Sequence, residues 1–185
     1  MHYFFKINLF LVCLFLFGCD NLQTRAGAIG DLNLFADDVT RARAVLEPKS
    51  GSKVSGVVTM TQEKKRIILV AKVMGLKPNS EHGFHIHQMG DCSAPDASSA
   101  GSHFNPYISD HGRMQENPHH LGDLINISAD ADGNADYQIA LEDVSLRPGK
   151  TSIIGRALVI HEEPDDYVTQ PSGNSGKRIA CGVIK

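Results

Sequence analysis

The chain has 185 residues and a net charge of −3 at pH 7, a length that fits one folded domain. Hydrophobic residues make up 42% and charged residues 21%, which excludes a disordered, collagen-like or polytopic membrane chain. Because there is no basic excess, no nucleic acid is expected as a partner. Histidine is the unusual residue, since seven of the nine histidines lie between positions 82 and 120.

Residues 1–18 show the pattern of an export signal. Lys6 precedes an apolar run at 9–17, which is too short to cross a bilayer, since a spanning helix needs about 20 residues. The residues that end in Cys19 resemble a bacterial lipobox, so we expect lipidation of Cys19, with simple cleavage or an uncleaved anchor as the alternatives. Residues 19–42 have no sustained period and are expected to form a tether.

Two cysteines are left for the folded body, because Cys13 lies in the apolar signal and Cys19 at its end. Cys92 and Cys181 are therefore an obvious pair, and disulfides persist in a protein outside the cytoplasm. Two buried thiols are the alternative.

Short runs rich in valine and isoleucine follow from residue 43 onward, separated by turn residues such as the hairpin signal Asp132-Gly133. With few helical stretches, they predict an all-β fold, an antiparallel sandwich or barrel of eight strands. The expected strands are 43–47, 53–61, 66–74, 83–88, 124–129, 135–141, 152–160 and 179–184.

Two long irregular segments interrupt the strands. Residues 89–121 contain three glycines, three prolines and no hydrophobic period, and residues 164–177 are likewise poor in strand residues. A loop as long as 89–121 is uncommon inside a compact domain and needs a restraint or a function. Metal ligation together with a bridge at Cys92 would provide the restraint.

His85 and His87 are separated by one residue, so on a strand both imidazoles lie on one face while Phe84 and Ile86 lie on the other. Such a pair can converge on one ion, but ordinary surface histidines are an equal alternative. His161 ends the run 152–160 and can meet this pair if the two strands are neighbours. Ligation by imidazoles alone favours Cu(II).

A second set of metal-binding side chains comes from the first irregular segment and its end. Three imidazoles and one carboxylate suit a closed, tetrahedral zinc site. These residues are His103, His111, His120 and Asp123.

Five segments in order resemble the signature blocks of the copper/zinc superoxide dismutases. They are GFHIH at 83–87, AGSHFNP at 100–106, HLGDL at 120–124, GRALVIHE at 155–162 and RIACGVI at 178–184. The resemblance covers residues 43–185 and implies an immunoglobulin-like Greek-key barrel or sandwich with two long functional loops. It implies an enzyme that converts superoxide to dioxygen and hydrogen peroxide with one copper and one zinc ion per subunit.

Carried over residue by residue, the resemblance also implies the role of each side chain. His103 would bridge the two ions, Arg178 would lie beside the open copper position, and Asp165 would link a copper histidine to a zinc histidine. Cys92 and Cys181 match the disulfide of the family. The implied copper ligands are His85, His87, His103 and His161, and the implied zinc ligands are His103, His111, His120 and Asp123.

The export signal and the Gly90-Asp91-Cys92 sequence are similar to the bacterial envelope branch of the family. This implies a periplasmic protein that protects the cell envelope, with a membrane tether if Cys19 is lipidated, and it leaves both a monomer and a homodimer open. The connection from His161 to Arg178 is short and lacks the lysine and acidic pair of the usual steering charges. Gln170, Pro171 and Ser172 lie there instead.

The main alternative is a dismutase-like envelope protein that carries copper and zinc without turnover. Family members of that kind usually lack a copper ligand or the arginine, whereas this chain has all of them. A structural β-sandwich that binds a partner is a third class, and it would require the five ordered segments to be a coincidence. His82 and His119 are expected to stay outside both metal sites.

Overall fold

A computed structural model describes residues 40–185. The expected export signal, the expected lipidation site at Cys19 and all of the tether up to residue 39 lie outside these residues. Within 40–185, no helix is long and apolar enough to span a membrane. The first strand begins at Arg41, slightly before the expected strand 43–47.

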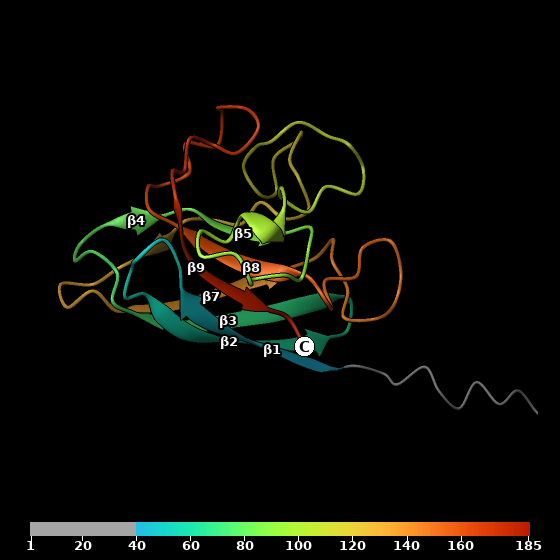
Figure 1. Cartoon of the computed structure of the whole chain (residues 1–185). Coiled ribbons are helices and arrows are strands. Elements are labelled where there is room, and N and C mark those ends of the chain that lie inside the picture. The colour runs from blue at the N-terminus through green and yellow to red at the C-terminus, as the bar shows by residue number, and fades with distance from the viewer. Residues whose placement is uncertain (1–39) are drawn as a thin grey trace, which may run out of the picture. The chain divides into compact units, whose positions relative to one another are not determined.

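The described part of the chain contains nine strands and one short 3-10 helix (Figure 1). The strands are β1 (Arg41–Pro48), β2 (Ser55–Glu63), β3 (Arg66–Met74), β4 (Glu81–His82), β5 (Phe84–His87), β6 (Ile127–Ser128), β7 (Ala135–Leu141), β8 (Ala157–His161) and β9 (Arg178–Val183), and the helix is η1 (Ser98–Ala100).

Most expected strands match the observed ones to within two residues at each end, and three differ more. Gly83 separates β4 from β5, which raises the count to nine, and only the two residues of β6 remain from 124–129. The run 152–160 forms a strand only from Ala157, because Arg156 N donates to Ile153 O in a turn and Gly155 has a φ of 75°. That angle belongs to the left-handed region and ends regular strand geometry.

Seven strands form one antiparallel sheet in the order β5-β8-β9-β1-β2-β3-β7. Strand β1 joins its two halves, since its first residues pair with β2 while Glu47 and Pro48 pair with β9. The outermost strands face each other, because the rings of Phe84 on β5 and Tyr137 on β7 meet edge to face at 5.6 Å. The sheet is therefore curled on itself, which confirms the expected all-β antiparallel fold.

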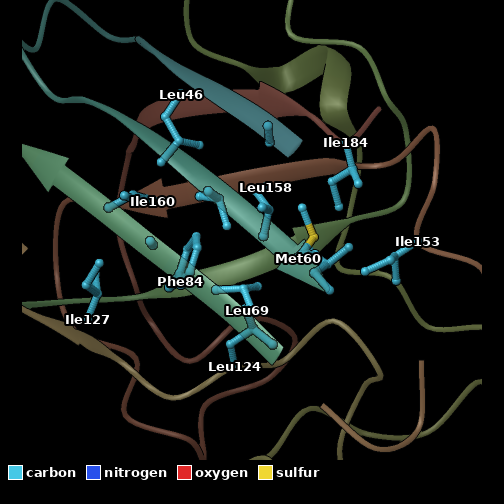
Figure 2. Packing of buried hydrophobic residues seen from close by; sticks show 14 of the residues in the cluster. Leu46, Met60, Leu69, Phe84, Leu124, Ile127, Ile153, Leu158, Ile160 and Ile184 are labelled. Atoms are coloured by element: carbon cyan, nitrogen blue, oxygen red, sulfur yellow. The ribbon is translucent and has the colours of Figure 1, made fainter. Parts of the chain in front are cut away.

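The core lies inside this curled sheet (Figure 2). Alternate residues of β3 are buried, as expected for a sheet with one face toward the core and one toward solvent. Strands β5 and β8 are different, because every residue in them is buried. Phe84, Ile86, Leu158 and Ile160 point into the core, so the other face of these two strands must be covered from outside.

The long segment 89–121 provides part of that cover. Ala97 and Ala100 form a second apolar cluster with Ala157, Val159 and Cys181 on the outer face of β8 and β9. A disulfide between Cys92 and Cys181 ties the segment to β9. The histidine-bearing face of β5 is thus enclosed between the sheet and a loop.

Candidate metal centre

The structure brings seven side chains into two adjacent groups, in each of which the ligand atoms lie within 4.8 Å of one another. All seven are buried. His103 belongs to both groups. The first is His85, His87, His103 and His161, and the second is His103, His111, His120 and Asp123.

The first group is built by strand pairing. Strands β5 and β8 pair with His85 opposite Val159, so the two histidines of β5 share their face with His161 at the end of β8. The register shifts between Ile160 and His161, and His161 then pairs with Arg178. Two isolated bridges join β5 to the rest of the site: one aligns His87 with His103 in the long segment, and the other aligns His85 with Asp123 just after it.

Four buried ring nitrogens have no hydrogen-bond partner among residues 40–185: His85 Nδ1, His103 Nε2, His111 Nδ1 and His120 Nδ1. A buried polar atom without a partner costs about 1–3 kcal/mol, so four of them in one place require an explanation. Asp123 oxygens lie 3.0 Å from His111 Nδ1 and 3.2 Å from His120 Nδ1 without forming hydrogen bonds. Atoms that approach in this way fit ligands that converge on a shared cation.

In four of the histidines, one ring nitrogen has a polar partner that orients the ring. Asp165 accepts from His85 Nε2 at 2.8 Å and from His111 Nε2 at 3.0 Å, so one carboxylate joins the two groups. His87 Nδ1 donates to Gly101 O at 2.8 Å, and His161 Nδ1 lies 3.1 Å from Ser175 Oγ. Such partners set the tautomer and orientation of each ring toward a metal ion.

The protonation states also suit metal binding. Burial lowers the pKa of His87 and of His161 well below the ordinary value, and burial together with the nearby His85 lowers the pKa of His103 to about 4. Burial alone would raise the pKa of Asp123, but contacts with the rings of the second group outweigh this effect. The net result is a pKa below the ordinary value, so the carboxylate is ionised. Neutral imidazoles and an ionised carboxylate are the forms that coordinate a metal.

His111 differs from the other histidines. Burial lowers its pKa, but the carboxylates of Asp123 and Asp165 raise it to about 9. Without a metal, a proton supplies the positive charge between these two carboxylates, and a cation in the second group would replace it.

Arg178 lies next to the first group and is half-buried. Its Nη1 donates to Ala97 O at 2.6 Å and its Nη2 donates to Gly101 O at 2.7 Å. Gly101 O is also the acceptor for His87 Nδ1, so one carbonyl oxygen holds the arginine and a ring of the first group together.

Several residues that support the site were not predicted. Asn126 and Asp165 bond reciprocally, with Asn126 Nδ2 donating to Asp165 O and Asp165 N donating to Asn126 Oδ1, each at 2.9 Å. A Cβ atom on Gly173 would overlap the Asp165 carboxylate. Gln170 bonds the backbone of His111. The Asn126 and Gln170 contacts join separate segments, and no spacing in the sequence indicates them.

The remaining two histidines of the cluster stay outside both groups, as expected. His82 Nδ1 donates to the backbone oxygen of His161 at 2.9 Å, and His119 Nδ1 donates to Glu116 O at 2.6 Å.

Comparison with known proteins agrees with this geometry. The family model for copper/zinc superoxide dismutase (SODC) matches residues 54–184. Superoxide dismutase (Cu-Zn) 1 of Aquifex aeolicus is 40% identical over 149 residues, which cover 78% of this chain and 88% of that protein. The superoxide dismutase-like protein YojM of Bacillus subtilis is 39% identical over 140 residues, which cover 74% of this chain and 71% of that protein.

Solved structures share the fold. The clock protein EA4 superposes with a TM-score of 0.71 at 39% identity, covering 78% of this chain and 93% of that one. A SOD-like protein from Bacillus subtilis gives a TM-score of 0.69 at 39% identity, covering 76% and 95%.

The curled antiparallel sheet and the two groups that share a histidine define a metalloprotein with two adjacent metal sites. With these relatives, the chain belongs to the copper/zinc superoxide dismutase family. It is an enzyme that converts superoxide to dioxygen and hydrogen peroxide, and its cofactors are copper and zinc.

Proposed function

We propose that the first group holds copper and the second holds zinc, one ion of each kind per subunit, with His103 as the shared ligand. The position of His103 carries this assignment. Its Nδ1 lies 2.7 Å from Asp123 Oδ1, while its Nε2 is buried and has no hydrogen-bond partner in the described part of the chain. One imidazole therefore offers a different nitrogen to each group. Four imidazoles suit copper, and three imidazoles with a carboxylate suit zinc.

Copper supplies one-electron redox chemistry when it is bound, while zinc has no redox chemistry and keeps its ligands in place. The reaction consumes two protons for each hydrogen peroxide formed. His103 Nε2 is the proposed proton carrier, because Nδ1 of the same ring is held on the Asp123 side. Asp165 keeps the rings of His85 and His111 in their orientation while that proton moves.

Arg178 is the proposed binding residue for the superoxide anion. Its guanidinium remains charged at any working pH, and two backbone oxygens fix it beside the first group. Because Gly101 O also holds His87, the cation and that ring keep a constant relative position.

The same proposal places the enzyme in the periplasm, attached to the cell envelope through a lipid on Cys19. The export pattern of residues 1–18 supports this location, and a relative from Brugia pahangi is named as an extracellular superoxide dismutase. Replacing Cys19 by Ala is expected to move the protein from the membrane fraction to the soluble fraction of lysed cells. The family resemblance leaves both a monomer and a homodimer open.

The function is tested on the purified mature protein by measuring bound copper and zinc and the decay of superoxide. The variant His161→Ala is expected to lose copper and activity but to keep zinc. Arg178→Ala is expected to keep both metals and to lose about tenfold or more in kcat/KM, because it removes the cation that attracts the anion.

Arg66→Ala serves as the matched arginine control, because Arg66 pairs with the exposed Glu63 at 3.5 Å and belongs to neither metal group. It should have the activity of the parent. A protein that decays superoxide no faster than free copper, or an Arg178→Ala variant with unchanged activity, would refute the proposed mechanism.

A further inference from the structure

Gln170 makes an unusual contact with the second metal-binding group. Its Oε1 accepts the backbone N–H of His111 at 2.8 Å, and its Nε2 donates to the backbone oxygen of His111 at 2.8 Å. One side-chain amide thus provides both hydrogen bonds that a neighbouring strand would give to this residue.

His111 depends on this contact because it lies in the irregular segment 89–121, outside any strand. The only backbone hydrogen bonds of His111 found among residues 40–185 are those with Gln170. Backbone groups in such a segment need partners, and here both come from one side chain. The ring is fixed separately, since its Nε2 donates to Asp165 Oδ1 at 3.0 Å.

The segment that carries Gln170 is itself held in a compact turn. Asp166 Oδ1 accepts the backbone N–H groups of Val168 and Thr169 at 2.9 and 2.8 Å, and Gly173 N donates to Thr169 O at 2.7 Å. Asp165 and Gln170 therefore lie close together in the same short segment. The side chain of Asp165 holds the ring of His111, and the side chain of Gln170 holds its backbone.

We propose that Gln170 is a positioning residue for His111, and that it sets the affinity of the second group for zinc. This inference rests on the proposed zinc site. With the ring and the backbone both fixed, His111 Nδ1 has one direction available, toward Asp123. Without Gln170, the backbone of His111 can shift. The His111 ligand is then no longer preorganised for the ion, and zinc affinity falls.

Partners of this kind change metal affinity by about 10- to 100-fold. Gln170 is exposed, so water can replace part of its hydrogen bonding, and we expect the lower end of that range. Zinc affinity should fall about tenfold on removal of the amide, while copper binding to the other group should change much less.

The experiment uses the full mature chain, stripped of metal by a chelator. Zinc affinity is measured by competition with a chromophoric chelator, and Co²⁺ reports the geometry of the zinc site through its visible absorption. Gln170→Met keeps the length of the side chain and removes both hydrogen bonds. It should bind zinc about tenfold more weakly than the parent, with a changed Co²⁺ spectrum.

Gln62→Met is the matched control. Gln62 Nε2 also donates to backbone oxygens, those of Lys64 at 3.2 Å and Arg66 at 2.9 Å, on the β2–β3 hairpin, which contributes no residue to either metal group. Loss of these two hydrogen bonds in Gln62→Met should lower the stability of the metal-free chain without changing its zinc affinity. A merely structural Gln170 would behave in the same way, and that result would overturn the proposal.

Two further variants make each outcome decisive. Gln170→Asn has the same polar groups on a shorter side chain that cannot reach both backbone atoms, and it replaces Gln170→Met if that variant does not fold. His120→Ala removes a proposed zinc ligand. If it leaves zinc affinity unchanged, the zinc site is wrong; if it weakens zinc but Gln170→Met and Gln170→Asn do not, only the role of Gln170 is wrong.

Discussion

The buried histidines make the stability of the metal-free protein depend on pH. Burial lowers the pKa of His87, His161 and His103, the last to about 4 from an ordinary 6.5. Between these two values the unfolded chain binds more protons than the folded one, so stability falls as pH falls. The low pKa of Asp123 adds to this loss at still lower pH.

His111 contributes a pH dependence of stability in the opposite direction. Its pKa is raised to about 9 from 6.5, so its contribution is complete below about 6.5 and is lost as pH rises toward 9. The urea midpoint of the metal-free protein should therefore be highest near neutral pH and should fall on both sides, more steeply on the acid side. A midpoint at pH 4 that equals or exceeds the midpoint at pH 7 would contradict this prediction.

Gly173 is predicted to be irreplaceable. Its φ is 64°, and a Cβ atom there would overlap the carboxylate of Asp165. Gly173→Ala should displace Asp165 from His85 and His111, lower the affinity for both metals and destabilise the protein by about 1–3 kcal/mol.

Gly51→Ala separates backbone strain from this collision, because Gly51 has a φ of 74° and open space around its Cβ position. It should lose stability but keep the metal affinity of the parent, as measured by chelator competition. If Gly173→Ala also keeps the metal affinity of the parent, the close approach of Gly173 does not determine the position of Asp165.

The sequence predicts residues of the metal groups better than the residues around them. His85 and His87 are indicated by strand alternation, and Asp165 by the family resemblance. Gln170 and Asn126 act through contacts between segments far apart in the chain, which have no local pattern. Such contacts become visible only when the fold brings the segments together.

At the scale of the elements, strands β5 and β8 have two functions at once. Their even and odd residues face different environments, the core on one side and the metal groups and loop on the other. The long, regular strands β2, β3 and β7 were predicted well, because their alternation depends on local sequence. Strand 152–160 was predicted too long, because the turn at Gly155 depends on backbone geometry that valine- and isoleucine-rich composition does not reveal.

The disulfide holds the loop element against the sheet. It closes a loop with a sequence separation of 89, for which chain entropy predicts at most about 4 to 5 kcal/mol. The double variant Cys92→Ser, Cys181→Ser should lose about 2–5 kcal/mol of unfolding free energy and should also lose activity, because Ala97 and Gly101 position Arg178.

Chemical denaturation with and without a reductant checks this prediction. The reductant should destabilise the parent and have no effect on the double variant. A parent insensitive to complete reduction would show that the loop is held by its apolar contacts alone.

At the scale of the whole molecule, metal binding is coupled to folding. Both groups draw ligands from strands and loops distant in sequence, so the unfolded chain cannot present either set. Free zinc at about a thousand times its dissociation constant should stabilise the protein by about 4 kcal/mol. Calorimetry of the metal-free protein with added zinc measures this effect as a rise in Tm.

His120→Ala provides the control for that measurement, since it removes one zinc ligand and leaves the first group complete. Its Tm should respond much less to zinc. An equal rise in the parent and in this variant would place the stabilising zinc elsewhere.

The arrangement of β5 also restricts how this protein can evolve in length. Inserting or deleting one residue in this strand would exchange its two faces, placing His85 and His87 in the apolar core and Phe84 and Ile86 against the metals. Length changes are far less harmful around Ile108, whose side chain is 93% exposed. Natural variation in chain length should therefore collect around Ile108 and avoid β5.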